Sequence, residues 1–204
     1  MAERIQRTID NLRKNSFDAH YFASGAEAAQ WIAAQIQPGE KVGFGGSMTT
    51  RSLDLVELTK RRGGTVLQHW GDGLSPERMR EIMAEALFAD KYFCSANAVT
   101  EDGFILNVDG TGNRIAATVF GPRQLFIIAG INKLVADSDA AFARIREIAP
   151  VNCRRLGMDT PCANSGVCVE CEVDARSCRA YMLLKRPTRF MDTKVVLIGE
   201  QLGL

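Results

Sequence analysis

Apolar and polar residues alternate along this chain with two periods, one typical of helices and one typical of buried strands. Ile5, Ile9 and Leu12 lie about one helical turn apart, so we expect an amphipathic helix over residues 2–15. Further helices are expected at residues 24–37, 47–62, 76–89, 114–120 and 138–149. Short apolar runs predict strands at residues 18–22, 41–44, 65–68, 91–95, 104–108, 124–129 and 194–198. Because helices and strands alternate, the pattern predicts an α/β fold with a mostly parallel sheet.

Capping and turn residues define several of these boundaries. Ser24 and Glu27 form a capping-box pattern, in which each side chain satisfies a free amide at a helix start. Ser75 is expected to cap the helix that follows it. Glu101-Asp102-Gly103 is expected to form a hairpin turn. Pro150 is expected to end the last helix, because proline lacks the amide hydrogen that a helix interior needs.

Length and charge narrow the class of protein. A chain of 204 residues can bury one full α/β core, and it contains no internal repeat or linker, so we expect a single domain over residues 1–204. Lys and Arg number 25 against 24 Asp and Glu, a formal net charge of +1 that offers no electrostatic case for binding nucleic acid or a membrane. The first residues lack the apolar segment of a signal peptide, and we expect a cytoplasmic protein.

Four of the six cysteines lie within a short stretch at a C-x5-C-x2-C-x6-C spacing. They are Cys162, Cys168, Cys171 and Cys178. Two cysteines separated by two residues can turn both sulfurs toward one metal, and the flanking pair is close enough to complete a site. Asn164 and Gly166 tolerate the tight turns that such a loop needs. The spacing therefore predicts a metal-binding segment at about residues 153–180, against the alternatives of disulfides or incidental thiols.

The kind of metal centre follows from how the cysteines are grouped. Zinc sites usually show two separate knuckles, whereas this chain has one knuckle with a cysteine on each side, which is nearer to iron–sulfur runs. We expect a [4Fe-4S] cluster, with zinc as the alternative. Arg176 and Arg179 flank Cys178, where cations would stabilise an anionic cluster or simply form a solvated basic face. Cys94 fits a core position, and Cys153 is either a spare ligand or a packed thiol.

A second group of candidate residues lies at the carboxyl ends of predicted strands. In an open parallel sheet, ligands bind outside those ends. Glycine-rich turns there can present backbone amides to a carboxylate or phosphate, although such glycines are often present for packing alone. The candidate substrate-binding residues are Gly45, Gly46, Ser47, Asn97, Asn107, Asp109, Gly110, Thr111, Gly112, Asn113, Asn132 and Lys133. Lys133, Asp109 and His69 are the catalytic candidates, with a structural histidine as the alternative for His69.

Several of these motifs together resemble the lactate-utilisation (LUD) domain family. The resemblance is carried by residues 45–50, 107–114, 120–122, 130–134, 149–152 and 199–203, which span nearly the whole chain. It implies a three-layer α/β/α fold of the NagB/RpiA/CoA-transferase-like group, with a pocket lined by the glycine turns and by Asn132-Lys133. Family members linked to lactate oxidation act beside separate iron–sulfur partners, whereas this chain carries its own four-cysteine loop.

The first functional hypothesis is an iron–sulfur enzyme, or enzyme subunit, that handles a small organic acid. The cluster would act by electron transfer, or as a Lewis acid if one iron is open. The alternative is a non-catalytic ligand-binding protein or a subunit of a redox complex, with a structural zinc or cluster site. The partners expected are a small carboxylate or phosphate ligand, a redox partner protein and a second copy of the chain in a homodimer.

Overall fold

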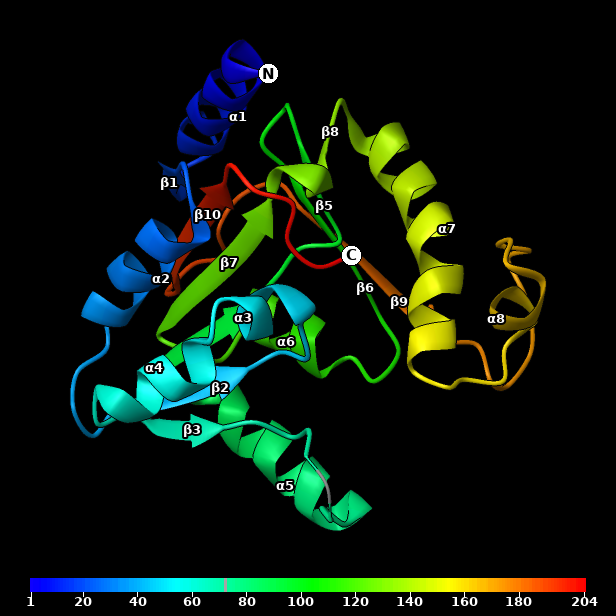
Figure 1. Ribbon diagram of the computed structural model, residues 1–204, viewed down its shortest axis with the longest axis horizontal. Helices are drawn as coiled ribbons and strands as arrows, with labels where there is room; N and C mark the ends of the chain where they lie inside the picture. Colours follow the sequence, from blue (N-terminus) through cyan, green and yellow to red (C-terminus); the bar gives the residue numbers. More distant parts are fainter. Residues whose placement is uncertain (72) are drawn as a thin grey trace.

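The computed structural model describes residues 1–71 and 73–204 and has an α/β fold built on a six-stranded sheet (Figure 1). The strands of this sheet are β1 (Asp18–Phe22), β2 (Lys41–Phe44), β3 (Thr65–Leu67), β4 (Lys91–Cys94), β7 (Gln124–Gly130) and β10 (Asp192–Ile198). Their order is β1-β10-β7-β4-β2-β3, and every neighbouring pair is parallel. The predicted α/β class and mostly parallel sheet are therefore confirmed.

Helices cover both faces of this sheet. One face carries α1 (Ala2–Lys14), α5 (Pro76–Leu87) and α6 (Asn113–Val119), and the other carries α2 (Gly25–Ala34), α3 (Met48–Ser52) and α4 (Leu55–Arg61). Alternation along β7 explains the two cores, because successive side chains of a strand point to opposite faces. Leu125 and Ile127 join the core under α1, whereas Phe126 and Ile128 join the core under α2. This is the expected three-layer arrangement.

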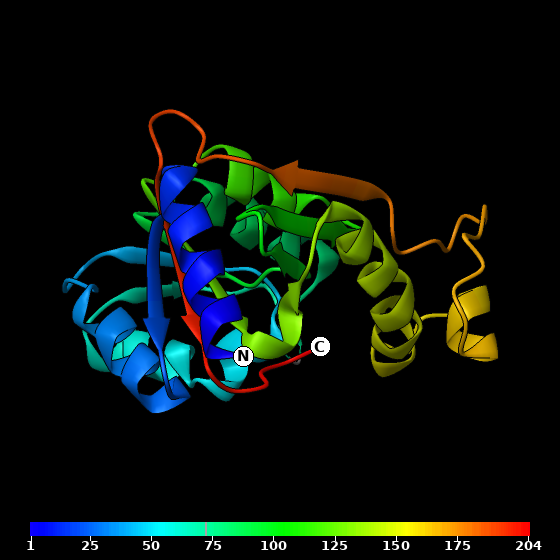
Figure 2. The same cartoon turned by 90° about the horizontal axis from the view of Figure 1, so that it is seen from above.

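A second sheet extends the fold. It contains β8 (Leu134–Val135), β5 (Ala98–Thr100), β6 (Ile105–Asp109) and β9 (Ala180–Leu184), in that order. The predicted hairpin joins β5 to β6, which are antiparallel. The helix α7 (Ser138–Arg155) packs on this sheet through Ala141 and Ile145. Figure 2 shows α7 and the segment that follows it projecting to one side of the molecule. Neither β8 nor β9 was predicted, since two-residue and isolated apolar runs resemble loops.

Two helix predictions were wrong. The helix expected over residues 47–62 is divided into α3 and α4, because Asp54 adopts a left-handed conformation with φ of 52°. The last helix does not end at Pro150 but continues for five more residues to Arg155. Packing offsets the cost of an internal proline there, since Cys153 in the added turn is buried against Cys162 and Ala163. These last two residues lie in α8 (Pro161–Ser165), a short helix that replaces part of the expected loop.

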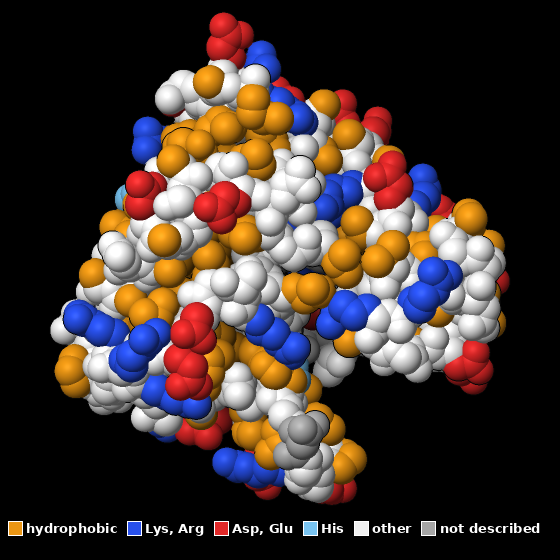
Figure 3. All heavy atoms as spheres, viewed as in Figure 1, with side chains coloured by type: hydrophobic (Ala, Val, Ile, Leu, Met, Phe, Trp, Pro, Cys, Tyr) orange, Lys and Arg blue, Asp and Glu red, His pale blue; other side chains and the backbone are white. Residues whose placement is uncertain are grey.

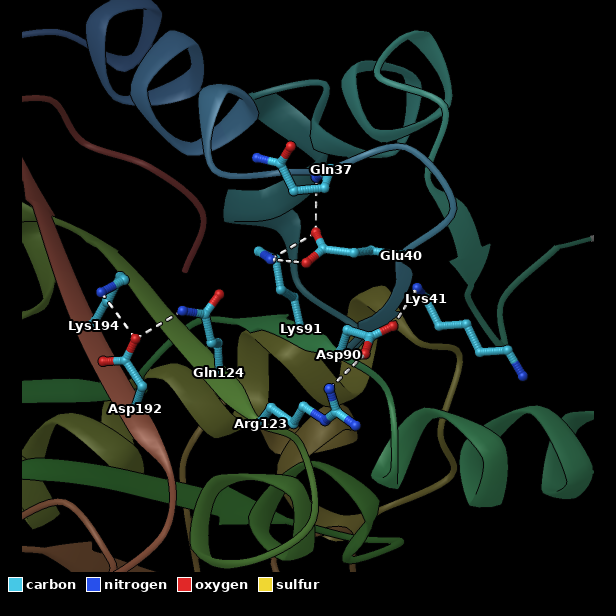
Figure 4. Close-up of polar contacts among 9 residues, drawn as sticks. All are labelled: Gln37, Glu40, Lys41, Asp90, Lys91, Arg123, Gln124, Asp192 and Lys194. Atoms are coloured by element: carbon cyan, nitrogen blue, oxygen red, sulfur yellow. Dashed lines mark hydrogen bonds and ion pairs between the residues drawn. The ribbon is translucent and has the colours of Figure 1, made fainter.

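Paired charges close the amino edge of the six-stranded sheet (Figure 4). Lys91, at the start of β4, is buried and binds both carboxylate oxygens of Glu40 at 2.5 and 2.6 Å. Lys194 pairs in the same way with Asp192, with 3.1 Å between Nζ and Oδ2. Because these charges satisfy one another, this edge offers little to a ligand. Among the helices of the described residues, none combines the length and the apolar character needed to cross a bilayer.

Candidate functional site

Five cysteines line one cavity of about 260 Å³, which we call the cysteine cavity. They are Cys153, Cys162, Cys168, Cys171 and Cys178. The loop cysteines were the predicted ligands, and the structure adds Cys153 from the end of α7. Cys153 and Cys162 are buried, the other three are half-buried, and all six cysteines of the chain are free thiols. Cys94 lies fully buried in β4, as expected of a core residue, and burial raises the pKa of its thiol to about 12.

Backbone contacts hold the cysteine loop in place. Thr160 caps α8, accepting from the Ala163 amide at 3.3 Å, and its hydroxyl lies 3.3 Å from the Cys162 sulfur. Gly166 has a φ of 80°, the left-handed conformation for which glycine was expected. Arg176 donates to the carbonyls of Cys178 at 2.8 Å and Cys171 at 2.9 Å. This arginine therefore shapes the loop backbone as well as adding positive charge beside the thiols.

The arrangement of the thiols bears on any bound centre. Among the residues described, no three Cys, His, Asp or Glu side chains are grouped closely enough to hold a single metal ion. The predicted metal-binding loop is therefore not shown as a metal site by the described residues. Burial, and next the neighbouring Cys153, Cys168 and Cys162, raise the pKa of the Cys178 thiol. Several thiolates in this cavity would repel one another, so they would need a cationic centre to compensate their charge.

A larger cavity of about 640 Å³ adjoins the cysteine cavity, and we call it the cationic cavity. It lies at the carboxyl ends of β2 and β4, where Gly46, Ser47 and Ser95 line it. Figure 3 shows the molecular surface hollowed between the main body and the part that carries α7 and α8. Six residues line both cavities: Ile145, Ala149, Cys153, Arg176, Ser177 and Cys178. The two cavities therefore share part of their lining, which we call the shared wall.

Most of the predicted pocket residues meet in the cationic cavity. Those that line it are Gly46, Ser47, His69, Asn97, Asp109, Gly110, Thr111, Asn113 and Lys133. Gly45, Asn107, Gly112 and Asn132 do not. The Asn107 side chain is fully buried and accepts from the Asn97 amide at 3.0 Å. Asn132 instead holds the last residues of the chain, accepting from the Leu202 amide at 3.0 Å and donating to the Gly203 carbonyl at 3.2 Å.

Two of the lining side chains have structural contacts. The Asp109 carboxylate accepts from the backbone amides of Arg114 and Ile115, at 3.1 and 3.2 Å, and so satisfies two free amides in the first turn of α6. The Ser47 hydroxyl accepts from the Thr50 amide at 3.4 Å and caps α3. Burial lowers the pKa of His69, so its imidazole is neutral at neutral pH.

Lys133 is the most perturbed cation of the site. Its side chain is only 3% exposed, and Nζ donates to the hydroxyls of Thr49 at 2.9 Å and Ser95 at 2.8 Å. Burial, with smaller contributions from Arg144 and Arg114, lowers its pKa to about 7. Burial without a carboxylate partner disfavours the charged amine, and an anion beside it would favour protonation.

Sequence reasoning missed most of the positive charge in this cavity. Six cations line it, Arg51, Arg114, Lys133, Arg155, Arg176 and Arg179, against the two carboxylates of Asp109 and Asp174. Within residues 1–71 and 73–204, none of the six forms an ion pair with a carboxylate. Their positions on helices and in loops look like solvated surface in the sequence, which carries no local signal for the cavity.

Comparisons with known proteins agree with this architecture. A family model that describes the LUD domain matches residues 5–198. A solved structure of a DUF162 family protein from Deinococcus radiodurans is 15% identical with a TM-score of 0.58, over 97% of this chain and 98% of that one. The structure of eIF2B beta from Chaetomium thermophilum is 20% identical over 57% of this chain and 44% of its own, with a TM-score of 0.41. The comparison with curated proteins gave no match.

Proposed function

Since this chain belongs to the LUD-domain family, we propose that it is a cytoplasmic iron–sulfur protein that binds and acts on a small organic acid. The observation that carries the proposal is the shared wall between the cysteine cavity and the cationic cavity. A site for an anion and a site rich in thiols meet at Cys153, Ser177 and Cys178, so a bound acid would lie beside a bound cluster.

In this proposal Cys162, Cys168, Cys171 and Cys178 hold a [4Fe-4S] cluster. When bound, the cluster supplies one-electron transfer, or a Lewis-acidic iron if one ligand position stays open. Electron transfer would also need a separate redox partner protein. Cys153, buried in the wall between the cavities, is the fifth thiol.

The cationic cavity binds the acid through charge. Arg114 is held rigidly, since it donates to the Asn97 side chain at 3.0 Å and to the Val108 carbonyl at 2.6 Å. Its guanidinium and the Lys133 amine line the cavity on the side of the sheet, where hydroxyls and amides surround them. A carboxylate or a phosphate would form ion pairs with Arg114 and Lys133, because neither cation has an acidic partner among the described side chains. Asn113 and Ser95 would bind the ligand's remaining polar atoms.

Anaerobic purification with iron, sulfide and zinc analysis tests the cluster. We expect about four irons per chain with visible absorption that bleaches on reduction. Serine replacement of Cys162, Cys168, Cys171 or Cys178 should lower the iron content, whereas Cys153→Ser, the matched control, should retain it. One zinc and no iron in the wild type would refute the redox function and favour a structural metal site in a non-catalytic protein.

Addition of a 2-hydroxy acid to the oxidised protein tests the acid site. We expect L-lactate or a related acid to perturb the visible or EPR spectrum of the cluster, because the bound acid would lie against the shared wall. Lys133→Met should abolish this response and leave the iron content unchanged. A cluster spectrum that no acid perturbs would argue against a combined site.

A further inference from the structure

We propose that the natural ligand of the cationic cavity carries two anionic groups, as a dicarboxylate or a phosphorylated acid does. This inference rests on the proposed acid site and specifies its substrate class. The first observation is size. A cavity of about 640 Å³ lies in the range of sites for ligands much larger than a three-carbon acid. A single carboxylate also leaves most of the cationic side chains without an anionic partner, since six Lys and Arg side chains of the described lining face two Asp side chains.

Four of the six cations form two groups that differ in exposure, one buried or half-buried and one exposed. The inner group is Lys133 and Arg114, and Arg114 is among the charges that act on the Lys133 amine. Both belong to the sheet side of the cavity, where Lys133 contacts Thr49 and Ser95 and Arg114 contacts Asn97. These contacts fix the inner cations in place before any ligand arrives, which makes this the binding site for the first anionic group.

The outer group is Arg51 and Arg155, both exposed at the rim. The Arg51 guanidinium lies 4.8 Å from the centre of the Trp70 ring, and Arg155 donates to the Asn152 side chain at 2.8 Å. Both residues line the cationic cavity, and the charge of Arg155 is the second cause, after burial, that lowers the pKa of Arg51. Two like charges brought together without a carboxylate are stabilised when an anion binds between them.

The acidic residues of the cavity do not neutralise either group. The Asp109 carboxylate already accepts from two backbone amides. Asp174 lies in the exposed cysteine loop and forms no ion pair within the described part of the chain. A ligand with one anionic group at each group of cations therefore matches the charge distribution better than a monoanion does.

Titration calorimetry on the purified full-length protein tests the inference at fixed ionic strength. The probes are L-lactate as the monoanion, L-malate as the dicarboxylate and 3-phosphoglycerate as the phosphorylated acid. We expect malate or 3-phosphoglycerate to bind at least about tenfold more tightly than lactate. Whichever of the two binds more tightly identifies the second group as a carboxylate or a phosphate.

Variants separate the two groups of cations. Arg51→Gln and Arg155→Gln should each weaken the dianion about tenfold and change lactate affinity less than about twofold. Both side chains are exposed, so the variants should fold. Arg62→Gln is the matched control, because Arg62 is also exposed, follows the end of α4 and is not part of the lining of either cavity. Equal affinity for lactate and both dianions, or equal losses for all three, would overturn the two-group ligand and leave the acid site intact. Failure of every probe to bind would instead refute the acid site itself.

Discussion

Burial of Lys133 disfavours the protonated form of its amine. The pKa of its amine is lowered from 10.5 to about 7, so the group is charged below that pH and increasingly neutral above it. Anion binding that needs the charged amine should weaken by up to about tenfold per pH unit above pH 7, because one proton is then taken up with the ligand. Calorimetry with 3-phosphoglycerate between pH 6 and pH 9 measures this slope. Lys133→Met should bind weakly at every pH and show a flat profile, whereas an unchanged slope would assign the proton to another group.

Asp109 offers a second test at a single position. Its carboxylate satisfies two free amides in the first turn of α6, so Asp109→Ala should lower the free energy of unfolding by about 1 kcal/mol. Asp109→Asn keeps an acceptor oxygen and should lose less. Urea denaturation measures both. A catalytic carboxylate would behave differently: Asp109→Ala would then keep its stability and lose activity on the acid.

The glycine turns and the polar residues at strand ends could be predicted because residues adjacent in the chain are enough to identify them. Gly46, Ser47 and Asp109 follow strands directly, and the structure brings them to one cavity. Arg51 and Arg155 could not be found in this way. Each lies on a helix that looks solvated in the sequence, and only the tertiary fold brings both to the lining of one cavity.

Among the elements, α1 is fixed by the hairpin between β5 and β6. Gly103 in that turn has a φ of 78°, and an added Cβ would lie 2.6 Å from the backbone of Asn11 and Leu12. Gly39 has a similar φ of 84° but open space around it. Gly39→Ala should therefore cost about 1 kcal/mol from backbone strain alone, and Gly103→Ala about 1–3 kcal/mol more from displacement of α1. Equal urea midpoints for the two variants would show that α1 moves away without cost.

The incorrect predictions of secondary structure are explained by tertiary contacts. Proline at position 150 is a strong local signal for a helix end, but burial of Cys153 one turn later extends α7. The break at Asp54 could not be predicted from a glycine or proline, because a non-glycine residue adopts the left-handed backbone there. The segment β9 is a strand because it pairs with β6, which is distant in sequence. Helical and strand periodicity thus predicted the central sheet well, and it failed where contacts distant in sequence decide the conformation.

For the whole molecule, the cysteine loop is the part with the least packing of its own. Residues 164–175 are mostly exposed and contain no strand. A cluster that cross-links four of its thiols should stabilise it, because any ligand that binds only the folded form shifts the equilibrium toward that form. We expect limited proteolysis to cut metal-free protein within this loop at least about tenfold faster than iron-loaded protein. Equal cleavage rates would mean that the loop is held by its backbone contacts alone.

In the proposed function, the residues shared by the two cavities would link the redox state of a bound cluster to retention of the acid. An electron added on one side of Cys153 and Cys178 raises the energy of a negative ligand on the other side, and the effect is reciprocal. A bound acid would therefore lower the midpoint potential, by about 59 mV for each tenfold difference in affinity between the two redox states of a one-electron centre. In a cell, such a protein would hold its ligand while oxidised and release it on reduction.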